Sequence, residues 1–112
     1  SDLTQMRFPD HYFDAIINFY YLQRELWKEF PRILKPGGVL VFESLTQPMR
    51  DVRPSIPPER LLAERELEQA FRAWEILVYR EGWSDNGLGK QKATASMVAR
   101  LPLNWNMESR DD

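Results

Sequence analysis

The feature that most constrains the fold is a strand, a helix and a second strand within the first 42 residues. Residues 13–21 are largely aromatic and β-branched, and their apolar centre does not alternate with polar residues, which is typical of a strand buried on both faces of a parallel sheet. Residues 22–34 carry apolar side chains at helical spacing, and Lys35-Pro36-Gly37-Gly38 then ends the helix and turns the chain. With an apolar run at 39–42, the segment predicts a βαβ unit whose two strands are parallel.

The second part of the chain predicts a loop, one further helix and an antiparallel hairpin. Residues 46–58 are rich in proline and read as a loop, and residues 59–74 return to helical spacing. Residues 74–81 read as a strand, and a turn region rich in Gly, Asn and Asp separates it from residues 92–101. In that last strand small or apolar residues at odd positions alternate with residues that are mostly polar, which predicts one buried face.

Composition excludes several classes of function. The 112 residues contain no Cys, which rules out disulfides, thiolate metal sites and Cys nucleophiles within them. His11 is the only histidine and no Gly-x-Ser-x-Gly elbow accompanies it, so neither a hydrolase triad nor a metal site is expected. The net charge of -2 offers no electrostatic basis for binding nucleic acid. No apolar run approaches the roughly 18–20 residues that span a bilayer, so we expect a cytoplasmic protein without membrane contact.

Two stretches of this sequence resemble a known family. The run Phe13-Asp14-Ala15-Ile16-Ile17-Asn18, a helix, and Leu34-Lys35-Pro36-Gly37-Gly38 before a hydrophobic strand resemble the fourth strand, fourth helix and fifth strand of class I S-adenosylmethionine-dependent methyltransferases. The helix and hairpin that follow resemble that family's last helix and reversed seventh strand, and the closest subgroup is the small-molecule or tellurite-resistance type. The resemblance implies an α/β fold, the C-terminal half of a Rossmann-like sheet in the order four, five, seven, six, with an antiparallel last strand and flanking helices.

The sequence also departs from the family. The family's glycine-rich cofactor loop after the first strand, and the acidic residue that ends its second strand, are not among these residues. Gly87 and Gly89 fall in a predicted hairpin turn and do not replace that loop. We therefore expect residues 1–101 to form a partial methyltransferase domain and residues 102–112 an irregular tail. Because the sequence starts without Met, we expect a processed, truncated or tagged chain. Because the cofactor loop and the acidic residue are missing from it, we expect that it does not bind cofactor alone.

The resemblance implies four cofactor-binding residues. Asp2 corresponds to the family's acid that accepts a hydrogen bond from the adenine amino group, and Leu3 to the residue that packs on the adenine ring. Asn18 and Phe19 end the first predicted strand, where they would face the amino-acid part of S-adenosylmethionine. The alternatives are a terminal acid for Asp2, a turn role for Asn18 and core packing for Phe19.

Four more residues are candidates for contact with a small-molecule methyl acceptor. Tyr20 follows the first strand, Gln23 and Arg24 start the next helix, and Glu43 ends the second strand. Glu43 would orient the acceptor or act as a base, and its alternative is a capping or ion-pair role. The alternative for Gln23 and Arg24 is that they are ordinary polar residues on the surface of a helix. No catalytic residue is identified, because methyl transfer mainly demands alignment of the nucleophile with the methyl group.

Three functions remain open from the sequence. The chain is half of a methyltransferase, or a non-catalytic half-domain that serves dimerisation or assembly, or part of another Rossmann-like enzyme that binds a nucleotide. The first strand of a partial sheet would leave a long apolar edge, which invites pairing with another chain. We therefore expect a homodimer through the Phe13–Tyr21 strand or its faces.

Overall fold

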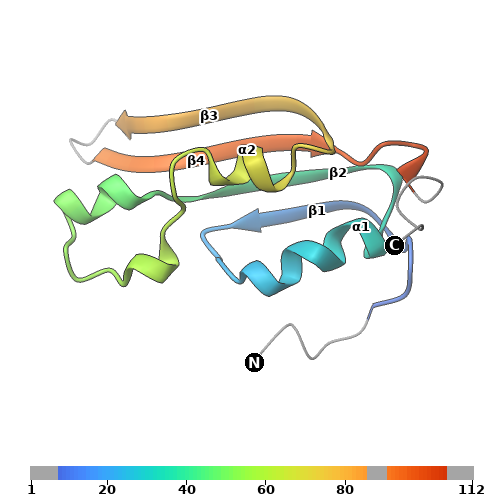
Figure 1. The fold of residues 1–112 in the computed structure, drawn as a ribbon, viewed down its shortest axis with the longest axis horizontal. Coiled ribbons are helices and arrows are strands. Elements are labelled where there is room, and N and C mark those ends of the chain that lie inside the picture. Colours follow the sequence, from blue (N-terminus) through green and yellow to red (C-terminus); the bar gives the residue numbers. More distant parts are fainter. Residues whose placement is uncertain (1–7, 86–90, 106–112) are drawn as a thin grey trace.

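A computed structural model describes residues 8–85 and 91–105, which form a four-stranded sheet with helices (Figure 1). The strands β1 (Phe13–Phe19), β2 (Leu34–Leu45), β4 (Gln91–Arg100) and β3 (Glu75–Asp85) lie in that order across the sheet. β1 runs parallel to β2, whereas β4 is antiparallel to both β2 and β3. The predicted α/β class and the order four, five, seven, six are thereby confirmed.

The helices are shorter than the sequence predicts. The described helical elements are η2 (Arg24–Glu29), α1 (Phe30–Ile33), η3 (Gln47–Asp51), η4 (Pro58–Arg60) and α2 (Glu66–Ala70), where η denotes a 3-10 helix.

Each shortening has a local cause. The predicted helix at 22–34 is split, because Pro31 lacks the N–H that an α-helix interior needs and is tolerated only in the first turn, where α1 begins. The predicted helix at 59–74 is interrupted at Arg65, whose φ of 59° lies in the left-handed region. α2 therefore starts only after that residue.

One face of the sheet carries the core. Leu40 and Phe42 of β2 and Met97 of β4 are almost fully buried there beneath the helices. Burying a side chain of this size contributes roughly 1.5–3 kcal/mol. The alternation predicted for the last strand is confirmed, because Ala93, Ala95, Met97, Ala99 and Leu101 are all buried. Figure 1 shows α1 and α2 on the same side of the sheet.

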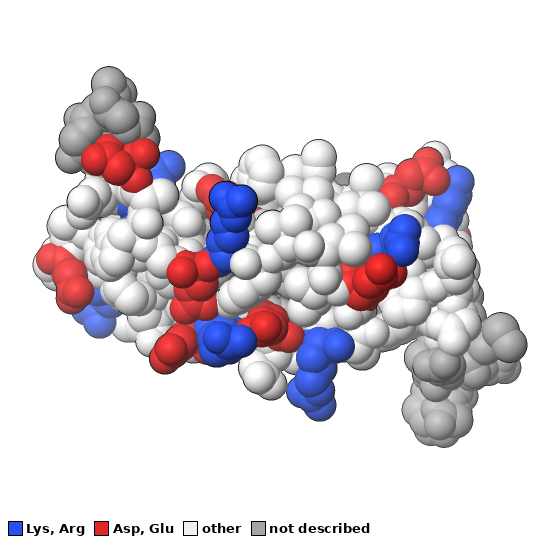
Figure 2. All heavy atoms as spheres, turned by 90° about the horizontal axis from the view of Figure 1, so that it is seen from above, with Lys and Arg blue, Asp and Glu red and all other residues white. Residues whose placement is uncertain are grey.

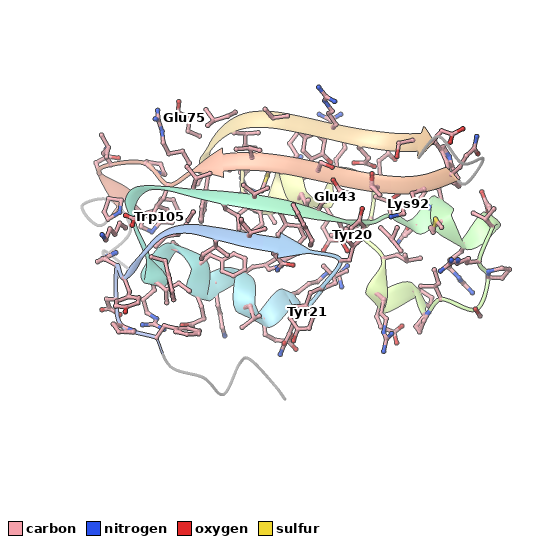
Figure 3. All side chains as sticks on the ribbon, turned by 180° about the vertical axis from the view of Figure 1, so that it is seen from behind. Tyr20, Tyr21, Glu43, Glu75, Lys92 and Trp105 are labelled. Atoms are coloured by element: carbon pink, nitrogen blue, oxygen red, sulfur yellow. The ribbon has the colours of Figure 1, made fainter. Side chains whose placement is uncertain are left out.

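The opposite face is not covered by any helix of the described chain, as the view from behind shows (Figure 3). Ile17 and Phe19 of β1 are 68% and 55% exposed on it. Ile17 pairs with Val41, and Val41 with Val98, so an apolar row crosses this face from β1 through β2 to β4. The prediction that the first strand is buried on both faces is therefore wrong for these residues, because helices pack against only one side.

The Pro-Gly-Gly segment belongs to β2 in the structure, and β2 begins at Leu34, directly after α1. Gly37 has a φ of 86°, a conformation that side chains disfavour. Its N–H donates to the carbonyl of Leu101 at 2.7 Å, and the N–H of Leu101 donates to Gly38 at 2.8 Å. The segment is thus part of β2 and not the predicted turn that precedes it, and it ties the start of β2 to the end of β4.

β3 is longer than predicted, since it continues to Asp85, whereas β4 has the predicted length and is displaced by one residue, to Gln91–Arg100. Gly87 and Gly89 lie outside the described residues. Seen from above, on the side of β3, acidic and basic side chains stand next to one another (Figure 2). Arg100 of β4 and Glu75 of β3 form an ion pair at 2.8 Å. This face therefore carries no large field of a single sign.

Candidate functional site

The candidate site lies where the two parallel strands end. Asn18 pairs with Phe42 and Phe19 with Glu43, so the carboxyl ends of β1 and β2 lie side by side. Figure 3 shows Tyr20, Glu43 and Lys92 close together at this end of the sheet. Ligands in open α/β sheets bind outside the carboxyl ends of strands.

Tyr20 and Glu43 are joined through backbone and side chain. The N–H of Tyr20 donates to the carbonyl of Glu43 at 2.7 Å, and the Tyr20 hydroxyl donates to Oε2 of Glu43. Tyr20 has a φ of 58°, a left-handed conformation that costs of order 1–3 kcal/mol in residues other than Gly. The surrounding contacts therefore hold a strained residue at the end of β1, which is common at functional sites.

Charge at this end of the sheet is arranged around Glu43. Its Oε1 accepts a hydrogen bond from the Ser96 hydroxyl at 2.7 Å. Hydrogen bonds from Tyr20 and Ser96, with a weaker contribution from Lys92, hold the pKa of Glu43 below its usual value. Burial, together with the hydrogen bond to Glu43, raises the pKa of Tyr20 to about 12. At neutral pH the pair is an ionised carboxylate and a neutral phenol.

Lys92 completes this cluster from β4. Its Nζ lies 4.8 Å from the centroid of the Tyr20 ring, within the range of a cation–π contact. Lys92 and Ser96 were not among the predicted site residues. Both belong to the outward-facing set of the last strand, but the cross-strand register that places Ser96 opposite Glu43 is not written in the sequence.

Asn18 and Phe19 end β1 on opposite faces of the sheet. Asn18 is 9% exposed, and its Oδ1 is a buried acceptor without a hydrogen-bond partner in the described part of the chain. Such a group costs free energy unless something donates to it, and it therefore marks a place where a ligand or water donor fits. Phe19 points to the open face, 55% exposed, so the alternative of core packing is wrong for it.

Arg24 is engaged by protein groups. Its Nε and Nη2 donate to the two carboxylate oxygens of Glu66 at 2.6 and 3.0 Å. Nη1 and Nη2 also donate to the carbonyls of Glu59 and Leu61 at 2.9 and 3.0 Å. This fork fastens η2 to the segment that leads into α2, which favours a structural role over the predicted contact with an acceptor.

A hollow of about 430 Å³ opens beside the end of β1. Tyr20, Tyr21, Leu22, Gln23 and Arg60 line it. The hydroxyl of Tyr21 donates a hydrogen bond to Oε1 of Gln23. Two of the predicted acceptor-binding residues, Tyr20 and Gln23, thus line the same hollow. Glu43 does not line the hollow, but it accepts a hydrogen bond from the hydroxyl of Tyr20.

A larger groove of about 780 Å³ runs along β1 and the helical segment beside it. Its apolar lining residues include Ala15, Ile17 and Phe19 of β1 and Leu26 and Phe30 of η2 and α1. No strand of the described chain pairs with the outer edge of β1.

The remaining predicted residues, Asp2 and Leu3, lie outside the described residues. In residues 8–85 and 91–105 no group of His, Asp and Glu side chains is arranged to hold a metal ion. No helix in the same ranges is long and apolar enough to cross a membrane.

We compared the sequence with models of protein families and with curated protein sequences. A family model described as a methyltransferase domain matches residues 1–42, which include β1, η2, α1 and most of β2. No curated protein sequence matches the chain.

Solved structures resemble the chain over most of its length. An S-adenosylmethionine-dependent methyltransferase from Methanosarcina mazei is 19% identical, with a TM-score of 0.69, covering 92% of this chain and 66% of its own. TehB from Haemophilus influenzae is 24% identical, with a TM-score of 0.64, covering 81% of this chain and 36% of its own. The cyclase SpnF is 20% identical, with a TM-score of 0.65, covering 92% and 54%.

These similarities define the class of fold. The chain has the fold of the class I S-adenosylmethionine-dependent methyltransferases, as the sequence resemblance predicted. It spans between 36% and 66% of the length of the three structures above.

Proposed function

We propose that these residues form the acceptor-side half of an S-adenosylmethionine-dependent methyltransferase with a small-molecule acceptor and a cytoplasmic location. The observation that carries the proposal is that Asn18, Tyr20 and Glu43 all lie at the carboxyl ends of β1 and β2, within a fold of this class, with Asn18 on the helix-covered face and Glu43 on the open face. A buried acceptor, a strained aromatic residue and an ionised carboxylate at this end of the sheet favour a binding site over simple packing.

The residues fit the cofactor in part. Bound S-adenosylmethionine would supply an electrophilic methyl group. The Oδ1 of Asn18 lacks a donor, and the cofactor's amino-acid end carries an ammonium group that can donate to it. Tyr20 and Glu43 would position the acceptor. Because its pKa is lowered, Glu43 is a better hydrogen-bond acceptor than proton acceptor at neutral pH.

The proposal also concerns cofactor binding by the 112 residues alone. The sequence has no glycine-rich loop between a strand and a helix, and backbone N–H groups of such a loop normally approach the cofactor closely. We propose that the isolated chain does not bind cofactor measurably, and that a further segment with strands pairing at the edge of β1 is needed.

Calorimetric titration with S-adenosylhomocysteine tests both parts of the proposal. We expect no heat of binding with the 112-residue chain, and binding with a longer chain extended upstream in its own reading frame. Asn18→Ala in the longer chain should weaken binding about tenfold, as expected for loss of a hydrogen bond to a charged group. Tight binding by the short chain would overturn the limit, and no binding by the longer chain would overturn the methyltransferase assignment.

A second candidate function is a dimerisation or assembly module. The observation that favours it is the unpaired edge of β1 in the described chain, next to a groove of about 780 Å³ and exposed Ile17 and Phe19. A second copy could add its own β1 to this edge and cover the apolar face. If the reading frame contains nothing upstream of these residues and the chain is dimeric by light scattering, this function is favoured over the first.

A further inference from the structure

The hollow beside β1 has the size and lining of a small-molecule site. Its volume of about 430 Å³ falls within the roughly 300–1,000 Å³ typical of such sites. Tyr20 and Tyr21 contribute two aromatic walls at the carboxyl end of β1, where Figure 3 labels them. Arg60, at the end of η4, contributes the only charged side chain among its lining residues.

Arg60 differs from Arg24 and Arg32, two other arginines of the described chain. Arg24 is fully occupied by Glu66 and two carbonyls, and Arg32 pairs with Asp10 and Glu29. The guanidinium of Arg60 has no ion pair or hydrogen bond to any described residue, and the side chain is exposed. An unengaged guanidinium fork at a hollow is suited to bind a planar carboxylate with two parallel hydrogen bonds.

The polar groups of the two tyrosines are already used. Tyr20 donates its hydroxyl to Glu43, and Tyr21 donates its hydroxyl to Gln23. What the hollow offers a ligand is therefore ring surface together with the cation of Arg60. Lys92 lies over the Tyr20 ring but is not among the residues that line the hollow, and the carboxylate of Glu43 already accepts hydrogen bonds from Tyr20 and Ser96.

We propose that this hollow binds a small aromatic carboxylate, with Arg60 holding the acid group and Tyr20 and Tyr21 contacting the ring. The inference rests on the proposed function insofar as the ligand is the methyl acceptor, and it makes Arg60 a specificity-determining residue. Binding of the acid group itself requires neither cofactor nor an upstream segment, because every lining residue belongs to this chain.

The test is an NMR titration of the 112-residue chain, without cofactor, with sodium benzoate and with its neutral isostere benzamide. We expect benzoate to shift the resonances of Tyr20, Tyr21 and Arg60, and to bind at least about tenfold more tightly than benzamide, since the charge-assisted bonds are lost in the amide. Equal affinities, or shifts confined to other residues, would overturn the proposal.

Two variants locate the effect. Arg60→Gln should weaken benzoate binding about tenfold and leave benzamide unchanged, whereas Arg53→Gln, an exposed arginine outside the hollow, should change neither. The spectrum of each unliganded variant shows whether it is folded. Unchanged benzoate affinity in folded Arg60→Gln overturns the inference. Because no cofactor is present, failure here is separate from failure of the titration with S-adenosylhomocysteine.

Discussion

Replacing Arg24 by Ala should cost the chain about 2 kcal/mol of unfolding free energy. The side chain spans 42 residues of sequence to reach Glu66 and also donates to the carbonyls of Glu59 and Leu61. The Arg24 and Glu66 side chains are 37% and 23% exposed, so solvent screening limits their ion pair to about 1 kcal/mol. The bonds to the two carbonyls add about 0.5 kcal/mol each in this part-exposed setting.

Urea denaturation of wild type and variant at one fixed protein concentration measures this loss, since a dimer would make stability concentration-dependent. Arg24→Lys, which keeps the charge but not the fork, should recover less than half of it. Arg53→Ala is the matched control on an exposed arginine and should stay within about 0.5 kcal/mol of wild type.

The pH dependence gives a second measurement of the same contact. The hydrogen bond from Arg24 holds the pKa of Glu66 below its ordinary value of 4.5. A lowered acid pKa stabilises the folded state above the ordinary value, and that contribution disappears as pH falls through the lowered one. Arg24→Ala should therefore lose about half of its deficit relative to wild type at acid pH, because the bonds to the two carbonyls do not depend on the ionisation of Glu66. A variant as stable as wild type that no longer binds benzoate would refute this reasoning and restore Arg24 as an acceptor-binding residue.

Three further outcomes follow from the structure. Gly38→Ala should lose about 2 kcal/mol in thermal unfolding, because the new Cβ would lie within 2.8–3.0 Å of two backbone carbonyl oxygens; an unchanged midpoint would contradict the packing described. Ile17→Lys should convert a dimer to a monomer in light scattering, whereas Val52→Lys should not; equal behaviour would exclude pairing through β1. Glu43→Gln should lower the pKa of Tyr20 from about 12 while leaving it above 10.0, since burial is the larger cause; NMR titration that finds no change would contradict the pairing.

The resemblance to the methyltransferase family was sufficient to predict the order and direction of the strands. The Pro-Gly-Gly segment and the alternation of β4 each reflect a local requirement, namely a positive φ at Gly37 and one buried face. The unbroken apolar run of β1 did not reveal that Ile17 and Phe19 are exposed. Helix length was predicted poorly, because Pro31 and the left-handed Arg65 divide segments whose apolar spacing is otherwise helical.

The sequence predicted where the candidate site lies, but not all of the residues that contribute to it. That Asn18, Tyr20 and Glu43 gather at one end follows from two parallel strands ending together. The contribution of Ser96 depends on a cross-strand register between residues 53 apart, and that of Arg60 on a loop folding back toward β1. Tertiary packing determines such long-range placements, and local sequence patterns do not reveal them. Asp2 and Leu3 stay predictions.

Fold alone does not choose a reaction on this scaffold, since a methyltransferase from Methanosarcina mazei and the cyclase SpnF both match the chain with TM-scores of 0.69 and 0.65. The side chains at the carboxyl edge of the sheet limit which reactions the chain can support. His11, the only histidine in the sequence, has its Nδ1 2.9 Å from the carbonyl of Leu34, at the end of the sheet opposite the carboxyl edge. Glu43 is held ionised by Tyr20 and Ser96 and is a weak base near neutral pH.

A nucleophile that must lose a proton therefore finds no well-matched base among the described residues of this edge. An acceptor whose reacting group is already ionised needs none, because methyl transfer then requires only alignment and exclusion of water. A carboxylate is such a group, and Arg60 is placed to hold one at the hollow. If the proposed function holds, the rate of methyl transfer to an aromatic acid by a longer chain, extended upstream in its own reading frame, should be nearly constant between about pH 6 and 8, where both a carboxylate and Glu43 stay ionised. A rate that rose tenfold per pH unit across that range would show that a proton must leave the acceptor, and would move the search for the base to the segment that completes the domain.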